Sequence, residues 1–306
     1  MRFVLVDWGT TRFRGYLVDG ETILDRVESE EGVSALKAGE HAGVFRRRCG
    51  AWLAAEPLPV ALVGMVGSRE GWVVAPYATC PAGPAEIAAA TTPVDLGEGR
   101  TGHVVPGLSC ENGGVDVMRG EETLALGAGV ADGLLCLPGT HPKWVEMRHG
   151  RIVRFATYFT GEMYALLRHH SMVGRPATEP EDPAGFDLGL DAAERNARDR
   201  VGLLHLIFGA RAAAVTGRLS SAALGPYISG LLTGDEVAGA FALFRKPDRV
   251  TVIAGAPRAD VFLRALARHG VEAAVRPPEA ALIAGIRRIL SARNGFAPAG
   301  VAGARG

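Results

Sequence analysis

One pattern occurs twice in this sequence and constrains its fold more than any other feature. An apolar run at residues 3–6 ends in a polar turn, and the chain returns as two further strand-like segments at residues 13–18 and 22–27. The same order of strand, Gly/Thr turn, strand, turn and strand is found again over residues 133–157. Internal repetition is stronger evidence than either copy alone. Two facing turns of this kind can hold a polyphosphate between two domains.

The first turn carries an acid, a glycine and two hydroxyls, namely Asp7, Gly9, Thr10 and Thr11. A glycine lets the backbone approach a phosphate closely, and hydroxyl and turn N–H groups can donate to its oxygens. A carboxylate among phosphate donors is repelled unless a cation intervenes, so Asp7 is better placed to hold Mg²⁺ or its water shell. The alternative is an ordinary tight hairpin with a polar tip. The second copy has Gly139, Thr140 and His141 at the corresponding place.

A second candidate site follows the next predicted strand. A helix at residues 39–55 and a buried strand at 60–66 make this an α/β protein. Ligand-binding groups in such folds gather at the carboxyl ends of strands, where Ser68 and Arg69 lie. They predict a site for an anionic, hydroxylated substrate; the alternative is a surface turn with a solvated arginine. Residues 74–100 are rich in proline and glycine, which predicts a long loop.

Two common nucleotide-binding motifs are excluded. Residues 97–102 match GxGxxG by letter but open no helix, and no Gly-Lys pair of a phosphate-binding loop occurs. A nucleotide therefore has to bind in another way.

Three carboxylates near the middle of the chain are candidates for a general base. We expect a short strand, a turn at residues 119–120, and a helix that begins with Glu121 and Glu122. Acids in a first helical turn are favoured by the helix dipole, which explains both without catalysis. Asp116, Glu121 and Glu122 could each accept a proton, and spacing alone does not choose among them.

The rest of the chain is predicted to form helices and one more strand. Residues 161–170 and 181–217 are predicted to be largely helical, with His205 packed in the core. Residues 229–236 are predicted to join two helices, with Thr233 or Asp235 as a cap. A strand is expected at residues 250–254.

The turn after this last strand contains Gly255, Ala256 and Arg258. Its small residues could admit a flat adenine or ribose, although such turns between strand and helix are common. A final helix is expected at residues 278–291, and residues 292–306 resemble a flexible tail.

Composition limits the class of protein. The 306 residues are 48% hydrophobic and 22% charged with zero formal net charge, so a soluble globular protein without a nucleic-acid or membrane partner is expected. The four cysteines form no CxxC motif, which predicts a reduced protein without structural zinc. Since no signal peptide or membrane-spanning run is found, a cytoplasmic location is expected.

Six segments together resemble a known family. They are similar to the superfamily of acetate and sugar kinases, Hsc70 and actin, and more closely to its 2-dehydro-3-deoxygalactonokinase family. The segments are residues 6–11, 64–72, 105–108, 116–123, 137–144 and 227–232. One departure is Pro142, where the family pattern has a serine; the proline removes a donor, so Thr140 is favoured as the phosphate ligand.

The resemblance implies duplicated ribonuclease H-like (actin-like ATPase) domains with a cleft between them. Residues 1–128 would hold phosphate 1 and the sugar-acid site, residues 129–291 phosphate 2 and the adenosine site, and residues 292–306 a tail. The turns at residues 9–11 and 139–141 would bind the ATP phosphates, and the turn with Gly255, Ala256 and Arg258 would bind adenosine.

The implied activity is transfer of the ATP γ-phosphoryl group to the 6-hydroxyl of 2-dehydro-3-deoxy-D-galactonate, with Mg²⁺ at Asp7. Superfamily topology favours Glu121 as the base, with Asp116 and Glu122 as rivals. Ser68, Arg69 and Trp72 would contact the sugar acid, and Arg69 would pair with its carboxylate. A homodimer is a possible assembly. The alternatives are a kinase for another sugar acid and a catalytically silent protein that senses ATP or sugar.

Overall fold

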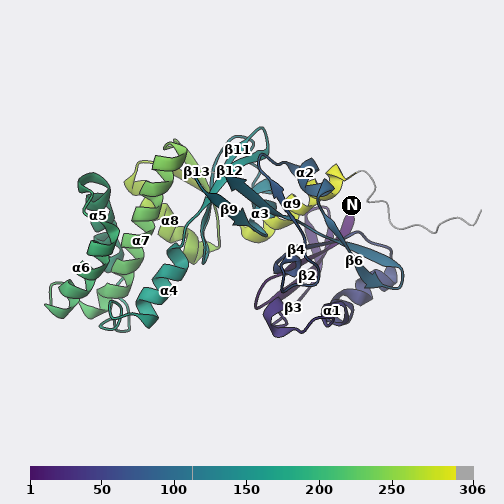
Figure 1. Cartoon of the computed structure of the whole chain (residues 1–306), viewed down its shortest axis with the longest axis horizontal. Coiled ribbons are helices and arrows are strands. Elements are labelled where there is room, and N and C mark those ends of the chain that lie inside the picture. Colours follow the sequence, from purple (N-terminus) through teal and green to yellow (C-terminus); the bar gives the residue numbers. More distant parts are fainter. Residues whose placement is uncertain (112, 294–306) are drawn as a thin grey trace, which may run out of the picture. The chain divides into compact units, whose positions relative to one another are not determined.

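The computed structural model describes residues 1–111 and 113–293, and this part of the chain divides into two compact units (Figure 1). Unit 1 comprises residues 1–132, 147–155 and 277–293, and unit 2 comprises Gly133–Glu146 and Ala156–Arg276. Both units are therefore discontinuous in sequence, and the domain boundary expected after residue 128 stays a prediction. No helix of the described part is long and apolar enough to cross a membrane.

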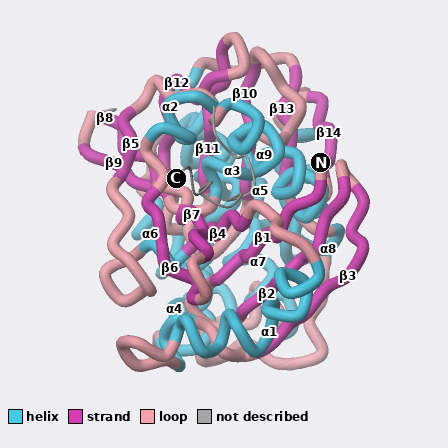
Figure 2. The backbone as a smooth tube through the Cα atoms, turned by 90° about the vertical axis from the view of Figure 1, so that its right-hand side faces the viewer, coloured by secondary structure: helices cyan, strands magenta, loops and turns pink. Residues whose placement is uncertain are grey.

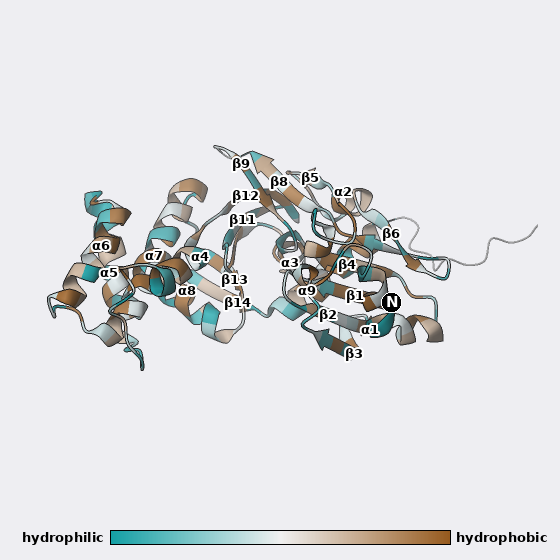
Figure 3. Cartoon of the chain, turned by 60° about the horizontal axis from the view of Figure 1, so that its bottom comes forward, coloured by the Kyte–Doolittle hydropathy of each residue, from teal (hydrophilic) through white to brown (hydrophobic). Residues whose placement is uncertain are grey.

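Unit 1 is built on a six-stranded mixed sheet in the order β3-β2-β1-β4-β7-β6, seen as a group of neighbouring strands in Figure 2. Its strands are β1 (Arg2–Trp8), β2 (Phe13–Asp19), β3 (Thr22–Ser29), β4 (Val60–Gly64), β6 (Thr92–Gly97) and β7 (Arg100–Val104). The runs of β1 and β4 pair in parallel and are almost wholly buried. Their hydrophobic residues are coloured brown in Figure 3. Helix α1 (His41–Ala55) packs its apolar side, including Val44 and Phe45, into the same core.

Two helices of unit 1 carry and support the candidate site. These are α3 (Glu121–Leu126) and the last described helix, α9 (Pro278–Ala292). A Cβ atom on Gly127 would overlap the Ala281 carbonyl oxygen, and one on Gly285 would overlap the Thr123 carbonyl oxygen. The two segments therefore approach at backbone distance, which only glycine permits there.

The prediction that residues 74–100 form a long loop is wrong. They contain β5 (Tyr77–Thr79), α2 (Pro84–Ala89) and all of β6. Strand β5 pairs with β8 (Gly107–Glu111), which pairs with β9 (Val115–Met118) in a separate three-stranded sheet. Pro84 begins α2, and the Gly83 N–H donates to Glu86 at 2.9 Å. The proline therefore marks a helix start rather than a loop.

The second sheet has the order β12-β11-β10-β13-β14, which repeats the order β3-β2-β1-β4 of the first. Its strands are β10 (Gly133–Leu137), β11 (Lys143–Arg148), β12 (Arg151–Thr157), β13 (Arg249–Ile253) and β14 (Glu272–Arg276). The repeat seen in the sequence is thus a repeat of topology. Strand β14 was not predicted.

Unit 2 adds five helices, which are α4 (Thr160–His170), α5 (Ala184–Asp199), α6 (Leu203–Val215), α7 (Ser221–Phe244) and α8 (Ala256–Arg268). The prediction of a helix junction at residues 229–236 is wrong, since this segment lies inside α7. Gly230 serves close packing there, because a Cβ atom would overlap the Phe186 carbonyl oxygen of α5. His205 is exposed on α6 rather than packed in the core.

Candidate functional site

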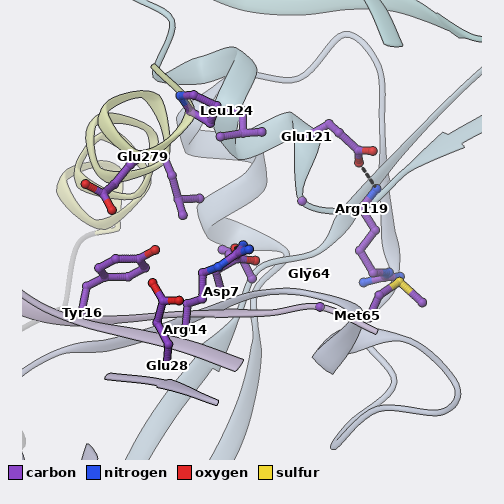
Figure 4. A pocket seen from close by; sticks show the side chains of 15 residues that line it. Asp7, Arg14, Tyr16, Glu28, Gly64, Met65, Arg119, Glu121, Leu124 and Glu279 are labelled. Atoms are coloured by element: carbon purple, nitrogen blue, oxygen red, sulfur yellow. Dashed lines mark hydrogen bonds and ion pairs between the residues drawn. The ribbon is translucent and has the colours of Figure 1, made fainter. Parts of the chain in front are cut away.

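A cavity of about 530 Å³ opens in unit 1 at the carboxyl ends of β1 and β4. Figure 4 shows Tyr16, Glu28 and Glu279 on one side of it and Arg119 and Glu121 on the other. Parallel strands end at one edge of a sheet, so residues distant in sequence meet there.

Asp7 lies at the end of β1 and is paired with an arginine of the neighbouring strand. Its Oδ2 accepts from Arg14 Nη1 at 3.1 Å, and the two residues are directly opposite in the β1–β2 register. Burial raises the pKa of Asp7, and Arg14 lowers it by a smaller amount. Gly64 (φ 90°) adjoins Asp7 in a backbone conformation that favours glycine, and a Cβ atom there would lie only 2.9 Å from the Trp8 carbonyl oxygen.

A metal ion at Asp7 would need other ligands than protein side chains. Within the described residues no group of three or more His, Cys, Asp or Glu side chains could hold a metal ion. Mg²⁺ usually keeps several waters and binds through one or two carboxylates plus substrate phosphates. A single carboxylate beside a glycine-containing turn fits that pattern.

The turn after β1 is braced from behind through its backbone. The Ser34 N–H and hydroxyl both donate to the Thr10 carbonyl, at 3.0 and 2.8 Å. A Cβ atom on Gly32 would overlap the backbone of Thr10 and Thr11, so this close approach requires glycine. Gly9 lines the cavity, while the side chains of Thr10 and Thr11 are exposed. The backbone of the turn is thus held in place, and both of its hydroxyl residues are exposed.

The structure separates the three candidate carboxylates. Glu121 lines the cavity, and its Oε2 accepts from the Arg119 N–H at 3.0 Å, drawn as a dashed line in Figure 4. Asp116 lies on β9, away from the cavity lining, and accepts from the Val117 N–H at 2.7 Å.

Glu122 points into the protein and is only 1% exposed. It accepts from the Gly120 N–H at 2.6 Å and from the Thr123 hydroxyl at 3.0 Å. Burial, together with the charge of Glu121, raises the pKa of Glu122 to about 7. Glu122 therefore caps the start of α3, and Glu121 alone among the three residues faces the cavity.

The predicted sugar-acid residues do not line this cavity. Arg69 is exposed and Ser68 is partly exposed after β4. Trp72 is partly buried and packs against the core, with its ring centroid 6.1 Å from that of Trp8 and 6.0 Å from that of Phe45. An aromatic residue in a polar turn is thus used here for packing.

Arg119 is a cavity residue that the sequence analysis took only for part of a turn. Its Nη2 donates to the Ala75 carbonyl at 2.9 Å, and its guanidinium carbon lies 4.4 Å from the centroid of the Tyr77 ring. Its Nε and Nη1 atoms are buried with no hydrogen-bond partner in the described structure. No local pattern marks this role, because Ala75 is 44 positions away.

Unit 2 has a cavity of its own, of about 160 Å³. It brings together Gly139 of the second turn and Arg258 of the turn after β13, with Thr160, Ser229 and Thr233 between them. Gly255 and Ala256 adjoin Arg258 but are exposed and do not line it.

The rest of the second turn is held by side chains. Thr140 and His141 are exposed at its tip. His141 Nε2 lies 2.5 Å from Glu162 Oε2, and its ring stacks on Phe159 at a centroid distance of 5.8 Å. Lys143, which is 4% exposed, donates to the His141 carbonyl at 2.8 Å.

Solved structures define the class of this fold. The chain matches the xylulose kinase from Lactobacillus acidophilus with a TM-score of 0.51 and 10% identity, covering 95% of this chain and 89% of that one. The predicted actin-like ATPase fold, found in sugar kinases, is thereby confirmed. Residues 7–289 match the model of the 2-keto-3-deoxy-galactonokinase family, and the chain belongs to that family.

Individual relatives agree with this assignment. The 2-dehydro-3-deoxygalactonokinase of Escherichia coli (strain K12) is 34% identical over 295 residues, covering 95% of this chain and 98% of that protein. A crystal structure of a Sinorhizobium meliloti protein, given the same enzyme name provisionally, is 30% identical. It matches with a TM-score of 0.83 over 95% of this chain and 98% of that one.

Proposed function

We propose that this protein is an ATP-dependent kinase that phosphorylates the 6-hydroxyl of 2-dehydro-3-deoxy-D-galactonate. Its products are 2-dehydro-3-deoxy-6-phospho-D-galactonate and ADP. Family membership and the name of the Escherichia coli relative support the substrate. The observation that carries the chemistry is that Glu121 and Asp7 line one cavity beside a glycine turn.

Glu121 accepts the proton of the substrate hydroxyl in this proposal. Phosphoryl transfer depends on positioning and charge neutralisation more than on covalent chemistry. The N–H groups and hydroxyls of residues 9–11 donate to the phosphates. Asp7 would hold Mg²⁺ or its water shell, and the ion would neutralise phosphate charge.

Unit 2 is proposed to bind the nucleotide. Gly139, Thr140 and His141 would contact phosphates, and Gly255, Ala256 and Arg258 would contact adenosine. The shared cavity of Gly139 and Arg258 supports this arrangement. Neutral donors and one arginine around a cavity without acidic lining suit a polyphosphate.

Two arginines are candidates for the carboxylate of the sugar acid. Ser68, Arg69 and Trp72 follow from the family pattern, while Arg119 lies in the cavity with Glu121. A planar guanidinium matches a carboxylate in two parallel hydrogen bonds. The family pattern makes Arg69 the first candidate for binding the sugar-acid carboxylate. Arg119 is a second candidate because it lies in the cavity.

The test is an ADP-release screen across hexonate derivatives with Mg²⁺ and ATP. We expect turnover with 2-dehydro-3-deoxy-D-galactonate, loss of turnover in Glu121→Gln, and retention in the matched control Asp116→Asn. Absence of turnover with every hexonate derivative would overturn the kinase assignment, and turnover with another sugar acid alone would reassign the substrate. Loss of turnover in Asp116→Asn alone would move the base to Asp116.

The homodimer and the cytoplasmic location stay predictions. Light scattering of the purified chain measures the first, and cell fractionation the second.

A further inference from the structure

A buried carboxyl group in unit 2 has no part in the proposed chemistry. Glu236 lies on α7 and is 2% exposed. Its Oε1 accepts from the indole N–H of Trp144 at 2.8 Å, while Oε2 is buried with no hydrogen-bond partner within the described residues. Burying a carboxyl group without full compensation is costly, so an acid at this place calls for a reason.

The contacts of Glu236 join three elements that meet at the second turn. Trp144 belongs to β11, which begins where that turn ends. The Thr160 side chain hydrogen-bonds the same carboxyl group, and Thr160 is the first residue of α4. Thr160 also lines the 160 Å³ cavity together with Gly139. Glu236 therefore does not line the cavity itself but contacts Thr160, which does.

The start of α4 is in turn locked to the turn. A Cβ atom on Gly161 would overlap the Gly139 carbonyl oxygen. The Glu162 N–H donates to the Thr140 carbonyl at 2.9 Å. A shift of Thr160 would thus move Gly139 and Thr140 as well, because the two backbone segments are in direct contact.

We propose that Glu236 is a positioning residue that fixes the second turn and the start of α4 for binding nucleotide phosphate. The inference rests on the proposed function, since the ligand is the nucleotide of the kinase. Glu236 acts through Thr160 and touches no reacting atom.

The charge of Glu236 supplies a readout that packing alone would not. Burial raises the pKa of Glu236 to about 7. The titratable groups that interact with it are Cys136, whose pKa burial raises well above its ordinary value, and Tyr158, whose pKa burial raises to about 12. Both stay neutral near pH 7, so neither masks the titration of Glu236.

Other charged groups of these elements contact residues other than Glu236. Asp235 accepts from Asn196 of α5, and Lys143 and Glu162 both contact His141. Phosphate charge beside the turn favours the uncharged form of Glu236. Nucleotide affinity should therefore fall as the pH rises through 7.

The experiment measures MgADP binding by calorimetry at pH 6, 7 and 8 for wild type, Glu236→Gln and Asp235→Asn. The control removes a carboxylate at the adjacent position of α7 that faces α5. We expect the affinity ratio between pH 6 and pH 8 to be about threefold larger in wild type than in Glu236→Gln. Asp235→Asn should follow wild type. Titration of ADP itself is common to the experiments on all three proteins and cancels.

An equal ratio in folded Glu236→Gln overturns the proposal, and MgADP binding by none of the proteins overturns the proposed function as well. If Glu236→Gln does not fold, Trp144→Phe gives the answer, because it keeps the carboxyl group and removes one donor that favours its charged form. The midpoint of the MgADP pH profile should then shift upward by about 0.5 pH unit. An unchanged midpoint overturns the proposal.

Discussion

The two turns that repeat in this chain have the same topology and different supports. The first, at residues 7–14, contains an ion pair within the hairpin, Asp7 with Arg14, and is braced by the backbone of residues 32–34. The second, at residues 138–143, has no acid of its own. It is held by buried Lys143, by the pair of His141 with Glu162, and by the start of α4.

The cavities beside the turns differ in the same way. Four carboxylates line the cavity of unit 1, namely Asp7, Glu28, Glu121 and Glu279, and none lines that of unit 2. Carboxylates suit proton transfer and a divalent cation, whereas a lining without them suits phosphate oxygens. The two copies thus share their strand order and differ in the lining of their cavities. Four predictions test the proposed separation of chemistry between them.

The largest effect is expected from Glu121, the proposed base in unit 1. Glu121→Gln should lower kcat by about 10²–10⁴-fold while MgADP binding is retained, because general-base catalysis contributes on that scale. Steady-state kinetics and calorimetry measure the two quantities. A loss of nucleotide affinity equal to the loss of kcat would contradict the separation of roles.

One buried acid in each unit should make stability depend on pH. The pKa values of Glu122 and Glu236 lie near 7, above the ordinary 4.5, so the folded state keeps protons that the unfolded state releases. Stability should therefore fall as the pH rises from about 4.5 to 7, by about 3 kcal/mol for each group, and level off above 7.

Urea unfolding at pH 5 to 8 measures this slope. Glu122→Gln and Glu236→Gln should each remove about half of it. If one variant alone abolished the pH dependence of stability, the prediction that each unit contributes one titrating acid would be wrong.

Each turn depends on one glycine behind it. Gly32→Ala and Gly161→Ala should each destabilise by about 1–3 kcal/mol, since a Cβ atom would overlap backbone in both places. Gly161→Ala should also weaken MgADP binding, measured by calorimetry, because a Cβ atom at Gly161 would displace the turn at residues 139–140 that is proposed to contact the phosphates. Matched controls are Gly50→Ala on α1 and Gly209→Ala on α6, where a Cβ atom meets nothing within 4 Å. These should stabilise by about 0.5–1 kcal/mol.

The smallest effect concerns the sugar acid. If Arg119 binds the carboxylate, Arg119→Gln should raise KM for the sugar acid about tenfold, with an unchanged KM for ATP. Arg69→Gln is the matched change on the exposed residue. A rise in KM confined to Arg69→Gln would return the role to the residue that the family pattern favours.

The sequence predicted the parts of the fold that have clear periodicity or long apolar runs. The three-stranded starts at residues 2–29 and 133–157 and helix α9 were found in this way. Strand β5 has three residues and helix α2 has six, too few to show a period against proline and glycine. Gly230 and Ser229 suggested a turn, because a glycine required by helix packing looks the same in sequence as a glycine in a loop.

The sequence placed Asp7 and Glu121 among the candidate site residues, and the structure brings both to the lining of one cavity. Trp72 could not be judged, because its burial depends on Trp8 and Phe45. Arg119 was missed since its environment comes from Ala75 and Tyr77. The predicted tail at residues 292–306 lies outside the described residues from position 294 on.

The close approach of α3 and α9 has a consequence for synthesis of the protein. Helix α3 carries Glu121, and its backbone packs against Gly285 of α9, more than 150 positions later. Unit 1 therefore cannot be completed until the ribosome has made α9, whereas all of unit 2 has emerged by then. Since domains generally fold as units during synthesis, we expect unit 2 to fold first. The candidate catalytic residue would be the last part of the molecule to reach its place.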